Sequence, residues 1–432
     1  MTPLAIDDPE RLAKGGYLSP GRYLEPGFMA LEADRLWPRV WQVAGRVAEI
    51  PNPGDWITYD LLDLAIIVVR GEDGVVRGFQ NVCPHRGSRL VDVRGSSPRF
   101  VCPYHCWAFE LDGALAAVPE REGFPPLDAR RQALRRVAVE AAAGFVFVHP
   151  DPDAEPLAAW LEGISEELAL YRFDEMSCFL RRRLELPCNW KTCLDAFQEV
   201  YHVRGIHPQL LPGLKIGLST FRYFGAHSRM INPNGDERAR GSGTEDDLDL
   251  IAAFRRSKAE AASIDIGGLE ERRITANFQY NVFPNLSINT HATGCQLFRF
   301  LPHASDPQRC SVDISLLERV APGRAKPPEA EPLELGSLDS GVGFGRSLEG
   351  FELPASVESF GEDLLQIYAA ALDQDFGALV DIQRGLRTRG LRELVLGHQE
   401  QRILHWNLLL DRCLEGEGFD DALRTRMADR AQ

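Results

Sequence analysis

Two short segments of the chain place cysteine and histidine at close spacing. In CPHRGSRL, Cys83 stands two residues before His85, and in CPYHCWAF, Cys102 stands three residues before His105. Two thiolates and two imidazoles could bind a structural zinc ion, but zinc sites usually pair cysteine with cysteine and histidine with histidine. Here each segment supplies one residue of each kind. The pattern therefore favours a metal centre to which both segments contribute equally, and zinc is the alternative.

A Rieske [2Fe–2S] centre matches this division, because two thiolates hold one of its irons and two imidazoles hold the other. Each segment then offers one ligand to each iron. Pro84 and Pro103 stiffen the tips of the two loops, and Gly87 permits a tight turn. The predicted cluster ligands are Cys83, His85, Cys102 and His105.

Neighbours of these ligands are candidates for tuning the potential of the cluster and excluding water from it. They are Ser88, Tyr104 and Trp107, and ordinary packing is the alternative role for each. Cys106 follows a ligand directly and cannot easily join the same cluster, so it is interpreted as a buried or spare thiol.

A second pair of histidines, His202 and His207, lies in the segment FQEVYHVRGIHP. On an unbroken helix, residues at this spacing point about 140° away from each other. Gly205 and Pro208 lie within and directly after the pair, so we expect the helix to end near Gly205 and the chain to bend there. Such a bend would bring the imidazoles together. Polar residues at a helix end are the alternative interpretation.

A cluster of this kind carries an electron and performs no chemistry on a substrate, so a second metal would give the electron a destination. Two histidines and one carboxylate form the Fe(II) site of non-haem oxygenases, which leaves positions open for O2 and substrate. His202 and His207 supply the imidazoles. The carboxylate is expected from the late helical segment ALDQDFGALVDIQRGL, which offers Asp373, Asp375 and Asp381.

The composition is that of an ordinary soluble globular protein, with 432 residues, 44% apolar residues and a net charge of −15. The lack of a basic stripe argues against nucleic-acid binding. The longest apolar run near the N-terminus, LAIIVV at 64–69, is too short for a membrane span, and the first residues do not resemble a secretory signal. Nine cysteines, a sparse and odd set, agree with reduced thiols in the cytoplasm.

The pattern of apolar residues predicts an α+β protein of three parts. Residues 1–40 are expected to be a helical, peripheral segment, and residues 41–150 an all-β domain of short strands separated by turns. Residues 151–432 mix strands with strongly helical segments, which predicts an antiparallel sheet with helices packed on it. The segments 232–247 and 321–347 are expected to be loops, and the first is a candidate gate for a pocket.

Several motifs in the same order make the chain similar to a known family. They are LWPRVWQVAG, the CPHRG and CPYH pair, NWK at 189–191, the E-x-Y-H-x4-H segment, and D-x7-Q-R-G-L near the end. Over almost its whole length the chain resembles the α subunit, or terminal oxygenase component, of the Rieske non-haem iron aromatic ring-hydroxylating oxygenases. The resemblance implies a Rieske domain followed by a catalytic domain of the helix-grip (START-like) fold, on which the N-terminal segment packs.

The resemblance also implies roles for individual residues. Asp375, in the D-x7-Q motif, matches the iron carboxylate of the family, and Glu199, three residues before His202, matches the acid that bridges cluster and iron. In the family this acid lies at the boundary between subunits of a head-to-tail homotrimer. There it would join His105 of one subunit to the iron site of the next. A small β subunit is a further candidate partner.

The implied reaction uses O2 and electrons from NADH. The chain has no G-x-G-x-x-G after a strand, so a separate reductase, with or without a ferredoxin, should deliver the electrons. Apolar residues of the predicted strands and loops favour an aromatic or other hydrophobic substrate, and so a mono- or dioxygenase of aromatic hydrocarbon catabolism. Most of Phe278, Tyr280 and Val282 are expected in the core, and a few of them are candidates for an apolar cavity lining together with Leu210, Leu211 and Phe298.

Two departures from the family leave the reaction type open. Many members have Asp where Glu199 stands, and Glu is found in a subset that includes demethylating and quaternary-amine enzymes, so oxidative O- or N-demethylation is the alternative function. Many members also have Gly where Cys106 stands. An electron carrier that uses only the cluster, and a START-like lipid-binding protein, are more distant alternatives, because neither requires both predicted metal sites.

Overall fold

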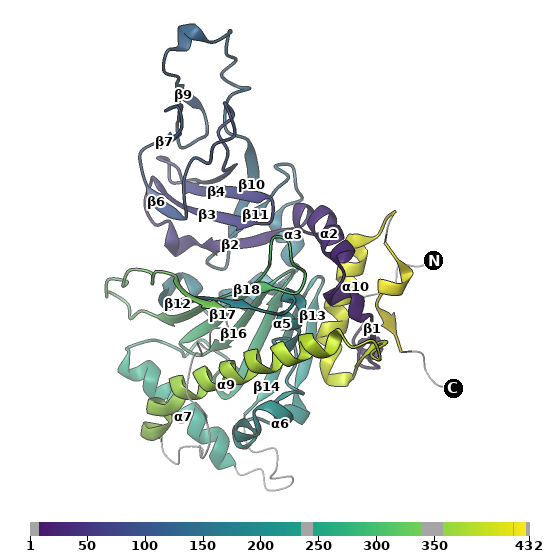
Figure 1. Ribbon diagram of the computed structural model, residues 1–432. Helices are drawn as coiled ribbons and strands as arrows, with labels where there is room; N and C mark the ends of the chain where they lie inside the picture. Colours follow the sequence, from purple (N-terminus) through teal and green to yellow (C-terminus); the bar gives the residue numbers. More distant parts are fainter. Residues whose placement is uncertain (1–7, 235–244, 338–356, 418, 429–432) are drawn as a thin grey trace. The chain divides into compact units, whose positions relative to one another are not determined.

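The computed structural model describes residues 8–234, 245–337, 357–417 and 419–428, and it divides into two compact units (Figure 1). The smaller unit is Trp37–Trp160 with Arg172–Asp174, and the larger unit contains the rest of the described chain. Arg46 joins the short segment Arg172–Asp174 to the rest of the smaller unit, because its guanidinium donates to the backbone oxygen of Phe173 at 3.0 Å. Each unit has its own sheets and its own core.

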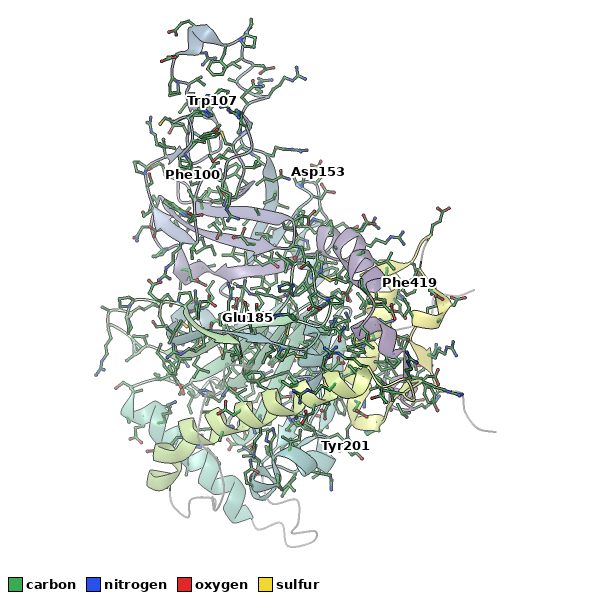
Figure 2. The ribbon with its side chains drawn as sticks, viewed as in Figure 1. Phe100, Trp107, Asp153, Glu185, Tyr201 and Phe419 are labelled. Carbon is green, nitrogen blue, oxygen red and sulfur yellow. The ribbon has the colours of Figure 1, made fainter. Side chains whose placement is uncertain are left out.

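The smaller unit is built from β-strands, in one sheet of order β2-β11-β10-β5-β4-β3-β6 and another of order β7-β8-β9. The strands are β2 (Gln42–Arg46), β3 (Asp55–Leu61), β4 (Leu64–Arg70), β5 (Val76–Gln80), β6 (Arg94–Ser96), β7 (Phe100–Val101), β8 (Ala108–Phe109), β9 (Leu115–Ala117), β10 (Arg136–Ala142) and β11 (Phe145–His149). Phe79, Phe100 and Trp107 form part of a core that includes Cys83 and Cys102 (Figure 2). The core therefore fixes the base of both cysteine loops.

An antiparallel sheet organises the larger unit, with the strand order β13-β14-β15-β16-β17-β18-β12-β19. Its strands are β12 (Met176–Leu186), β13 (Thr220–Phe224), β14 (His227–Pro233), β15 (Ala276–Val282), β16 (Leu286–His291), β17 (Gly294–Pro302), β18 (Cys310–Arg319) and β19 (Leu333–Ser337). The edge strand β19 differs from the others, because it pairs parallel to β12. The long helix α9 (Val357–Leu386) crosses this sheet (Figure 1).

A small sheet joins the two ends of the described chain. Its central strand, β1 (Gly16–Leu18), lies between β20 (Leu394–Leu396) and β21 (Arg426–Met427). The remaining α-helices are α1 (Pro9–Leu12), α2 (Pro26–Arg35), α3 (Leu157–Leu161), α4 (Ile164–Ala169), α5 (Trp190–Ala196), α6 (Val203–Ile206), α7 (Glu245–Ala261), α8 (Glu271–Thr275) and α10 (Gln401–Leu414). None of the helices within the described ranges is long and apolar enough to cross a membrane.

The predicted α+β class, with an all-β domain and an antiparallel sheet that carries helices, is confirmed. The loop expected at 321–347 is partly wrong, because Leu333–Ser337 forms β19, while residues 338–347 lie outside the described residues. Of the loop expected at 232–247, residues 235–244 lie outside the described residues, and α7 begins at Glu245.

Buried polar contacts anchor the start of α5. The side chain of Asn189 caps the helix, and its backbone N–H donates to Gln383 of α9 at 3.0 Å. Lys191 donates to Glu32 of α2 at 2.7 Å, and these two side chains are only 1% and 2% exposed. Burial raises the pKa of Glu32 and lowers the pKa of Lys191, and the attraction between the two groups opposes both shifts. The pair fixes the helix that precedes the second histidine pair.

Replacing Lys191 with Met should destabilise the protein by about 3 to 5 kcal/mol, because the buried Glu32 carboxylate loses its partner cation. The double variant Lys191→Met/Glu32→Gln should recover part of this loss, since it leaves no charge unpaired. Urea unfolding followed by circular dichroism measures both free energies. A loss below about 1 kcal/mol in the single variant, typical of a surface pair, would contradict an anchoring role.

Candidate metal centres and active site

The two cysteine loops of the smaller unit share one pattern of backbone hydrogen bonds. The N–H of Cys83 donates to the carbonyl oxygen five residues on at 2.7 Å, and the N–H of Cys102 does the same at 2.8 Å. The return bonds run from Gly87 to Cys83 at 2.9 Å and from Cys106 to Cys102 at 3.0 Å. The two loops are therefore equivalent turns that present their cysteines in the same way.

Gly87 and Cys106 occupy matching positions, and both have a left-handed backbone, with φ of 77° and 56°. Glycine adopts this conformation freely, whereas a residue with a side chain gives up about 1 to 2 kcal/mol there. This geometry explains why glycine suits the position that Cys106 occupies. Cys106 is a free and exposed thiol, so of the two interpretations, a buried or a spare thiol, the structure favours the second.

The predicted cluster ligands lie together at the ends of these loops. The rings of His85 and His105 have centroids 4.7 Å apart, and Cys83 and Cys102 are buried beneath them. Trp107 stacks on His85 at 4.8 Å with the ring planes 3° apart. The Nδ1 atom of His105 is buried and has no hydrogen-bond partner among the described residues. An imidazole nitrogen in this state is available to bind a metal.

The surroundings of the two sulfur atoms also suit metal binding. Burial raises the pKa of the Cys83 thiol. At Cys102 burial acts in the same direction, but hydrogen bonds from the backbone N–H groups of Tyr104 and His105 outweigh it and lower the pKa. Donors aimed at a sulfur favour the thiolate, which is the form that binds iron. With the unpartnered His105 nitrogen, these residues fit a [2Fe–2S] cluster.

In the larger unit, His202 and His207 lie at the two ends of one short helical turn. Helix α5 ends at Ala196, and the chain is irregular until α6 begins. His202 is the N-cap of α6 and His207 is its C-cap, where φ of −123° and ψ of 50° turn the chain out of the helix. The expected helix end near Gly205 and the bend after it are present, since α6 ends at Ile206 and the chain turns at His207. The break after Ala196 was not expected.

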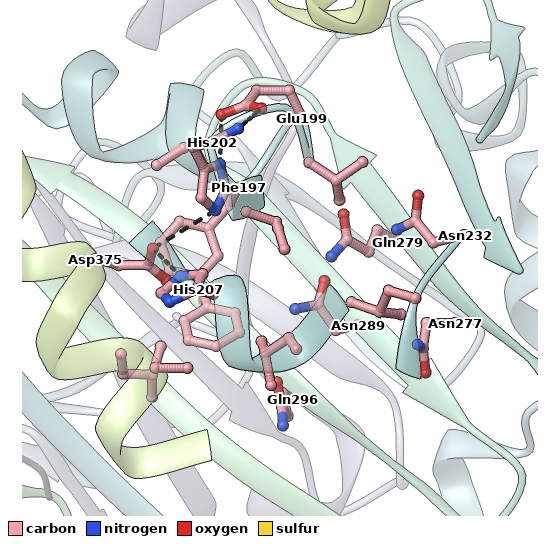
Figure 3. A pocket seen from close by; sticks show the side chains of 18 of the residues that line it. Phe197, Glu199, His202, His207, Asn232, Asn277, Gln279, Asn289, Gln296 and Asp375 are labelled. Carbon is pink, nitrogen blue, oxygen red and sulfur yellow. Dashed lines mark hydrogen bonds and ion pairs between the residues drawn. The ribbon is translucent and has the colours of Figure 1, made fainter. Parts of the chain in front are cut away.

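These breaks bring both imidazoles to Asp375 of α9 (Figure 3). The Oδ1 atom of Asp375 lies 2.7 Å from Nε2 of His207 and 3.6 Å from Nε2 of His202. One ligand atom from each of the three residues lies within 4.8 Å of the other two. Two imidazoles and one carboxylate at this separation fit a single metal ion with open coordination positions.

Further side chains orient the imidazoles through their other nitrogens. Glu199 Oε1 lies 2.5 Å from Nδ1 of His202, and Gln374 Oε1 lies 2.8 Å from Nδ1 of His207. An acceptor on Nδ1 keeps the proton there and leaves Nε2 free for a metal. Burial lowers the pKa of His202, but Glu199, with help from Asp375, outweighs burial and leaves this pKa raised. Gln374 is absent from the sequence prediction, although it directly precedes Asp375.

The other candidate carboxylates do not join this group. Asp381 is exposed and pairs with Arg384 at 3.0 Å. Asp373 lies two residues before Asp375 on the same helix, a step that turns a side chain about 200° around the axis. The group of metal-ligating side chains found among the described residues contains Asp375 and neither of the other two acids. The predicted contact between Glu199 and His202 is present, whereas the one between Glu199 and His105 of another subunit stays a prediction.

A cavity of about 160 Å³ lies beside the triad, between α9 and the sheet (Figure 3). Glu199, His202, His207 and Asp375 form one end of it. A volume of this size suits a small molecule, since an apolar cavity of about 150 Å³ can hold benzene. The apolar part of the lining consists of Ala196, Phe197, Val200, Val203, Leu210, Leu214, Phe298, Ala371 and Leu372.

The sheet turns a polar face toward the cavity. Phe278, Tyr280 and Val282, which the sequence made candidates for the lining, are buried on the opposite face of β15. Asn277 and Gln279, at the alternate positions, line the cavity instead. The carboxamide side chains on this wall are Asn232, Asn277, Gln279, Asn289 and Gln296. The apolar set of β15 packs in the core, as expected for most of it, whereas Leu210 and Phe298 line the cavity and Leu211 does not. Phe298 lies on β17, so the sheet side combines carboxamides with one aromatic ring.

Comparison with known proteins agrees with both metal centres. A family model described as ring hydroxylating alpha subunit (catalytic domain) matches residues 173–416, and a Rieske [2Fe-2S] domain model matches residues 40–129. The chain belongs to the ring hydroxylating alpha subunit family. It carries a Rieske domain before the family's catalytic domain, as its sequence motifs predict.

One curated relative shows how far the sequence similarity extends. The glycine betaine monooxygenase oxygenase subunit of Chromohalobacter salexigens is 36% identical over 193 residues, which are 44% of this chain and 43% of that protein. The match therefore spans less than half the length of this relative.

Solved structures share the fold over nearly the whole chain. A quaternary ammonium Rieske monooxygenase, CntA, in complex with L-carnitine has a TM-score of 0.69 at 19% identity, and the match covers 96% of this chain and 100% of that one. Naphthalene 1,2-dioxygenase with bound indole has a TM-score of 0.66 at 20% identity and 94% coverage of both chains. Likeness at this level of identity establishes the fold and leaves the substrate open.

Replacing Asp375 with Ala should lower bound iron from about three atoms per chain to about two, because the mononuclear site loses its carboxylate while the cluster keeps all of its ligands. The visible absorbance of the cluster should persist. Asp373→Ala is the matched control and should retain all of the iron. Metal analysis of the purified variants checks both statements, and the reverse pattern would make Asp373 the ligand.

Proposed function

We propose that this chain is the oxygenase component of a monooxygenase that hydroxylates a carbon attached to the nitrogen of a small quaternary ammonium compound. The observation that carries the proposal is the character of the cavity beside the triad. It has a wall of carboxamides, and no lysine or arginine lines it in the part of the chain that the structure describes. Such a lining favours a polar cation over a hydrocarbon.

Two further observations support this substrate class. Phe197 and Phe298 line the cavity with ring centroids 4.5 Å apart, and aromatic faces attract quaternary ammonium groups. The similarity to the glycine betaine enzyme is the second. Oxidative N-demethylation of a quaternary amine, the alternative function that Glu199 suggested, is thus favoured over hydroxylation of an aromatic ring. Ring hydroxylation was the leading expectation from the sequence.

The metal sites follow from the residues that fit them. Under this proposal the cluster ligands are Cys83, His85, Cys102 and His105, and the iron ligands are His202, His207 and Asp375. When bound, the cluster supplies single electrons and the iron supplies activation of O2. Glu199 and Gln374 hold the protons on Nδ1 of the two iron-site histidines and so keep both rings oriented.

The proposed reaction balances with one O2, two electrons and two protons, as a monooxygenase of this metal class requires. One oxygen atom enters a C–H bond next to the nitrogen, and the other leaves as water. The hydroxylated product then breaks its C–N bond and gives an aldehyde, a tertiary amine and a proton. NADH is the proposed electron source, through a separate reductase with or without a ferredoxin, since the sequence has no dinucleotide-binding motif.

A substrate panel tests the proposed chemistry. The holoenzyme, supplied with a reductase and NADH, should convert trimethylammonium compounds to tertiary amine and aldehyde with consumption of O2. Aromatic hydrocarbons and methoxyarenes should give no product, because the cavity offers polar contacts that such compounds leave unpaired. Mass spectrometry after reaction under ¹⁸O2 identifies the products, and the His207→Ala variant is the inactive control. Labelled phenols or dihydrodiols, with no turnover of any trimethylammonium compound, would refute the proposal.

We also propose a head-to-tail homotrimer in which Glu199 lies at the boundary between subunits. Both oxygens of Glu199 already contact His202, since Oε2 accepts from its backbone N–H at 3.0 Å. A carboxylate has about four lone-pair sites, so Glu199 retains capacity for one more donor. A cluster histidine of the next subunit would be that donor. A heterologous interface that closes on itself gives such a ring.

Mixed oligomers test this path. Chains with Cys83→Ser lack the cluster and chains with His202→Ala lack the iron, so each should be inactive alone. Co-expression should restore part of the activity, because an intact cluster then meets an intact iron site across a boundary. The Glu199→Gln variant should keep both metals and reduce the cluster at a normal rate, yet pass electrons onward slowly. Mixed trimers that stay as inactive as their parents would contradict electron transfer between subunits.

A further inference from the structure

Three carboxamides form a row across the wall of the cavity. Gln279 of β15 pairs in register with Asn289 of β16, and Asn289 pairs with Gln296 of β17, so the three side chains follow one another across neighbouring strands (Figure 3). All three line the cavity. The Oε1 atom of Gln279 and the Oδ1 atom of Asn289 are buried and have no hydrogen-bond partner in the described ranges.

The other two carboxamides of this wall are already engaged. Asn277 accepts from Arg255 at 2.6 Å and donates to Asn234 at 3.0 Å. Asn232 accepts from the hydroxyl of Ser219 at 2.7 Å. These contacts give both residues a structural role. The row differs, because the side-chain oxygens of Gln279 and Asn289 have no partner among the described residues, and a donor bound in the cavity would supply one.

The row is uncharged, and no lysine or arginine lines the cavity within the described ranges. His291 also lines the cavity, and burial lowers its pKa to about 4, so it is neutral at pH 7. The two cations that act on His291 are both engaged with other groups. Lys258 pairs with Glu318 at 2.5 Å, and Arg255, which donates to Asn277, also donates to the backbone oxygen of Ile274 at 2.6 Å. A substrate carboxylate at the row would thus be buried without a partner cation, which is unfavourable.

We propose that Gln279, Asn289 and Gln296 bind an uncharged tail of the substrate that carries an O–H or N–H donor. This assignment rests on the proposed function, in which the quaternary nitrogen lies at the end of the cavity formed by Glu199 and Asp375. The donor of the tail pairs with the free carboxamide oxygens, and the carboxamide N–H groups donate to the oxygen of the tail. The row therefore selects a trimethylammonium alcohol or amide over a trimethylammonium carboxylate or hydrocarbon.

Three probes that differ only in the tail test this assignment on the holoenzyme by calorimetry. They are choline with a hydroxyethyl tail, glycine betaine with a carboxymethyl tail, and trimethyl(propyl)ammonium with a hydrocarbon tail. Choline should bind roughly tenfold more tightly than the propyl compound, as one or two buried hydrogen bonds allow, and more tightly than glycine betaine. This comparison needs no variant, so it stands whether or not a substituted protein folds.

Variants then locate the preference. Gln279→Leu and Asn289→Leu should each reduce the preference for choline over the propyl compound to roughly twofold or less, because the hydroxyl loses a partner. Asn281→Leu is the matched control, since Asn281 lies on the same strand and outside the lining, and it should keep the preference. Thermal unfolding confirms that each variant is folded.

The outcomes separate this assignment from the function on which it rests. If all three probes bind equally, if glycine betaine binds most tightly, or if the Leu variants keep the preference, the row is not the tail site, while the proposed function stands. If no trimethylammonium compound binds and none is turned over, the proposed function itself fails and the assignment fails with it.

Discussion

The arrangement of the larger unit depends on a geometric constraint at the proposed iron site. Two imidazoles close together in the sequence must meet a carboxylate 168 residues away from His207. A continuous helix would point the two rings apart, so the chain breaks after Ala196 and uses one turn, α6, with a histidine at each end. The break is tolerated because α5 is held on both sides, by Glu32 of α2 through Lys191 and by Gln383 of α9. Helix α9 therefore has two roles: Gln383 holds α5, which precedes the two histidines, and Asp375 supplies the carboxylate of the triad.

In each of the two units, buried polar atoms without a hydrogen-bond partner lie where we propose that a ligand binds. In the smaller unit, Nδ1 of His105 lacks a partner where two thiols and two imidazoles converge. In the larger unit, the oxygens of Gln279 and Asn289 lack partners where the sheet faces the cavity. A buried polar atom without a partner destabilises the folded protein. This cost is removed when a ligand supplies the missing hydrogen bond or metal bond. We infer that the fold keeps these atoms unpaired because a cluster and a substrate pair them.

Sequence reasoning reaches furthest where chemistry requires particular residue types at short spacing. The alternation of Cys83, His85, Cys102 and His105 predicts the equivalent loops, and their matching hydrogen bonds follow. The backbone strain at Cys106 was harder to foresee, because a sequence shows a cysteine without its φ angle. The exact break of the helix also escaped prediction. Gly205 marks flexibility, but the break depends on contacts of α5 with distant elements, which no local pattern records.

The cavity shows a different limit. Alternation along β15 separates Phe278 and Tyr280 from Asn277 and Gln279, but it does not say which set faces the inside when helices cover one side of a sheet. The apolar set packs in the core, and the polar set that resembled a solvent face lines the cavity. The signal for a polar cavity wall was the repeat of carboxamides on three adjacent strands, since Asn289 and Gln296 on the later strands continue the face of Gln279.

The central claim is that one chain holds two separate iron centres and that His202, His207 and Asp375 form the second of them. Anomalous X-ray scattering from crystals of the holoenzyme, recorded on both sides of the iron absorption edge, tests this directly. We predict one peak for a mononuclear iron in contact with those three residues, and a separate peak for the pair of irons beside Cys83, His85, Cys102 and His105. A mononuclear iron bound to Asp373 or to Glu199 in place of Asp375, or no peak outside the cluster, would contradict the account.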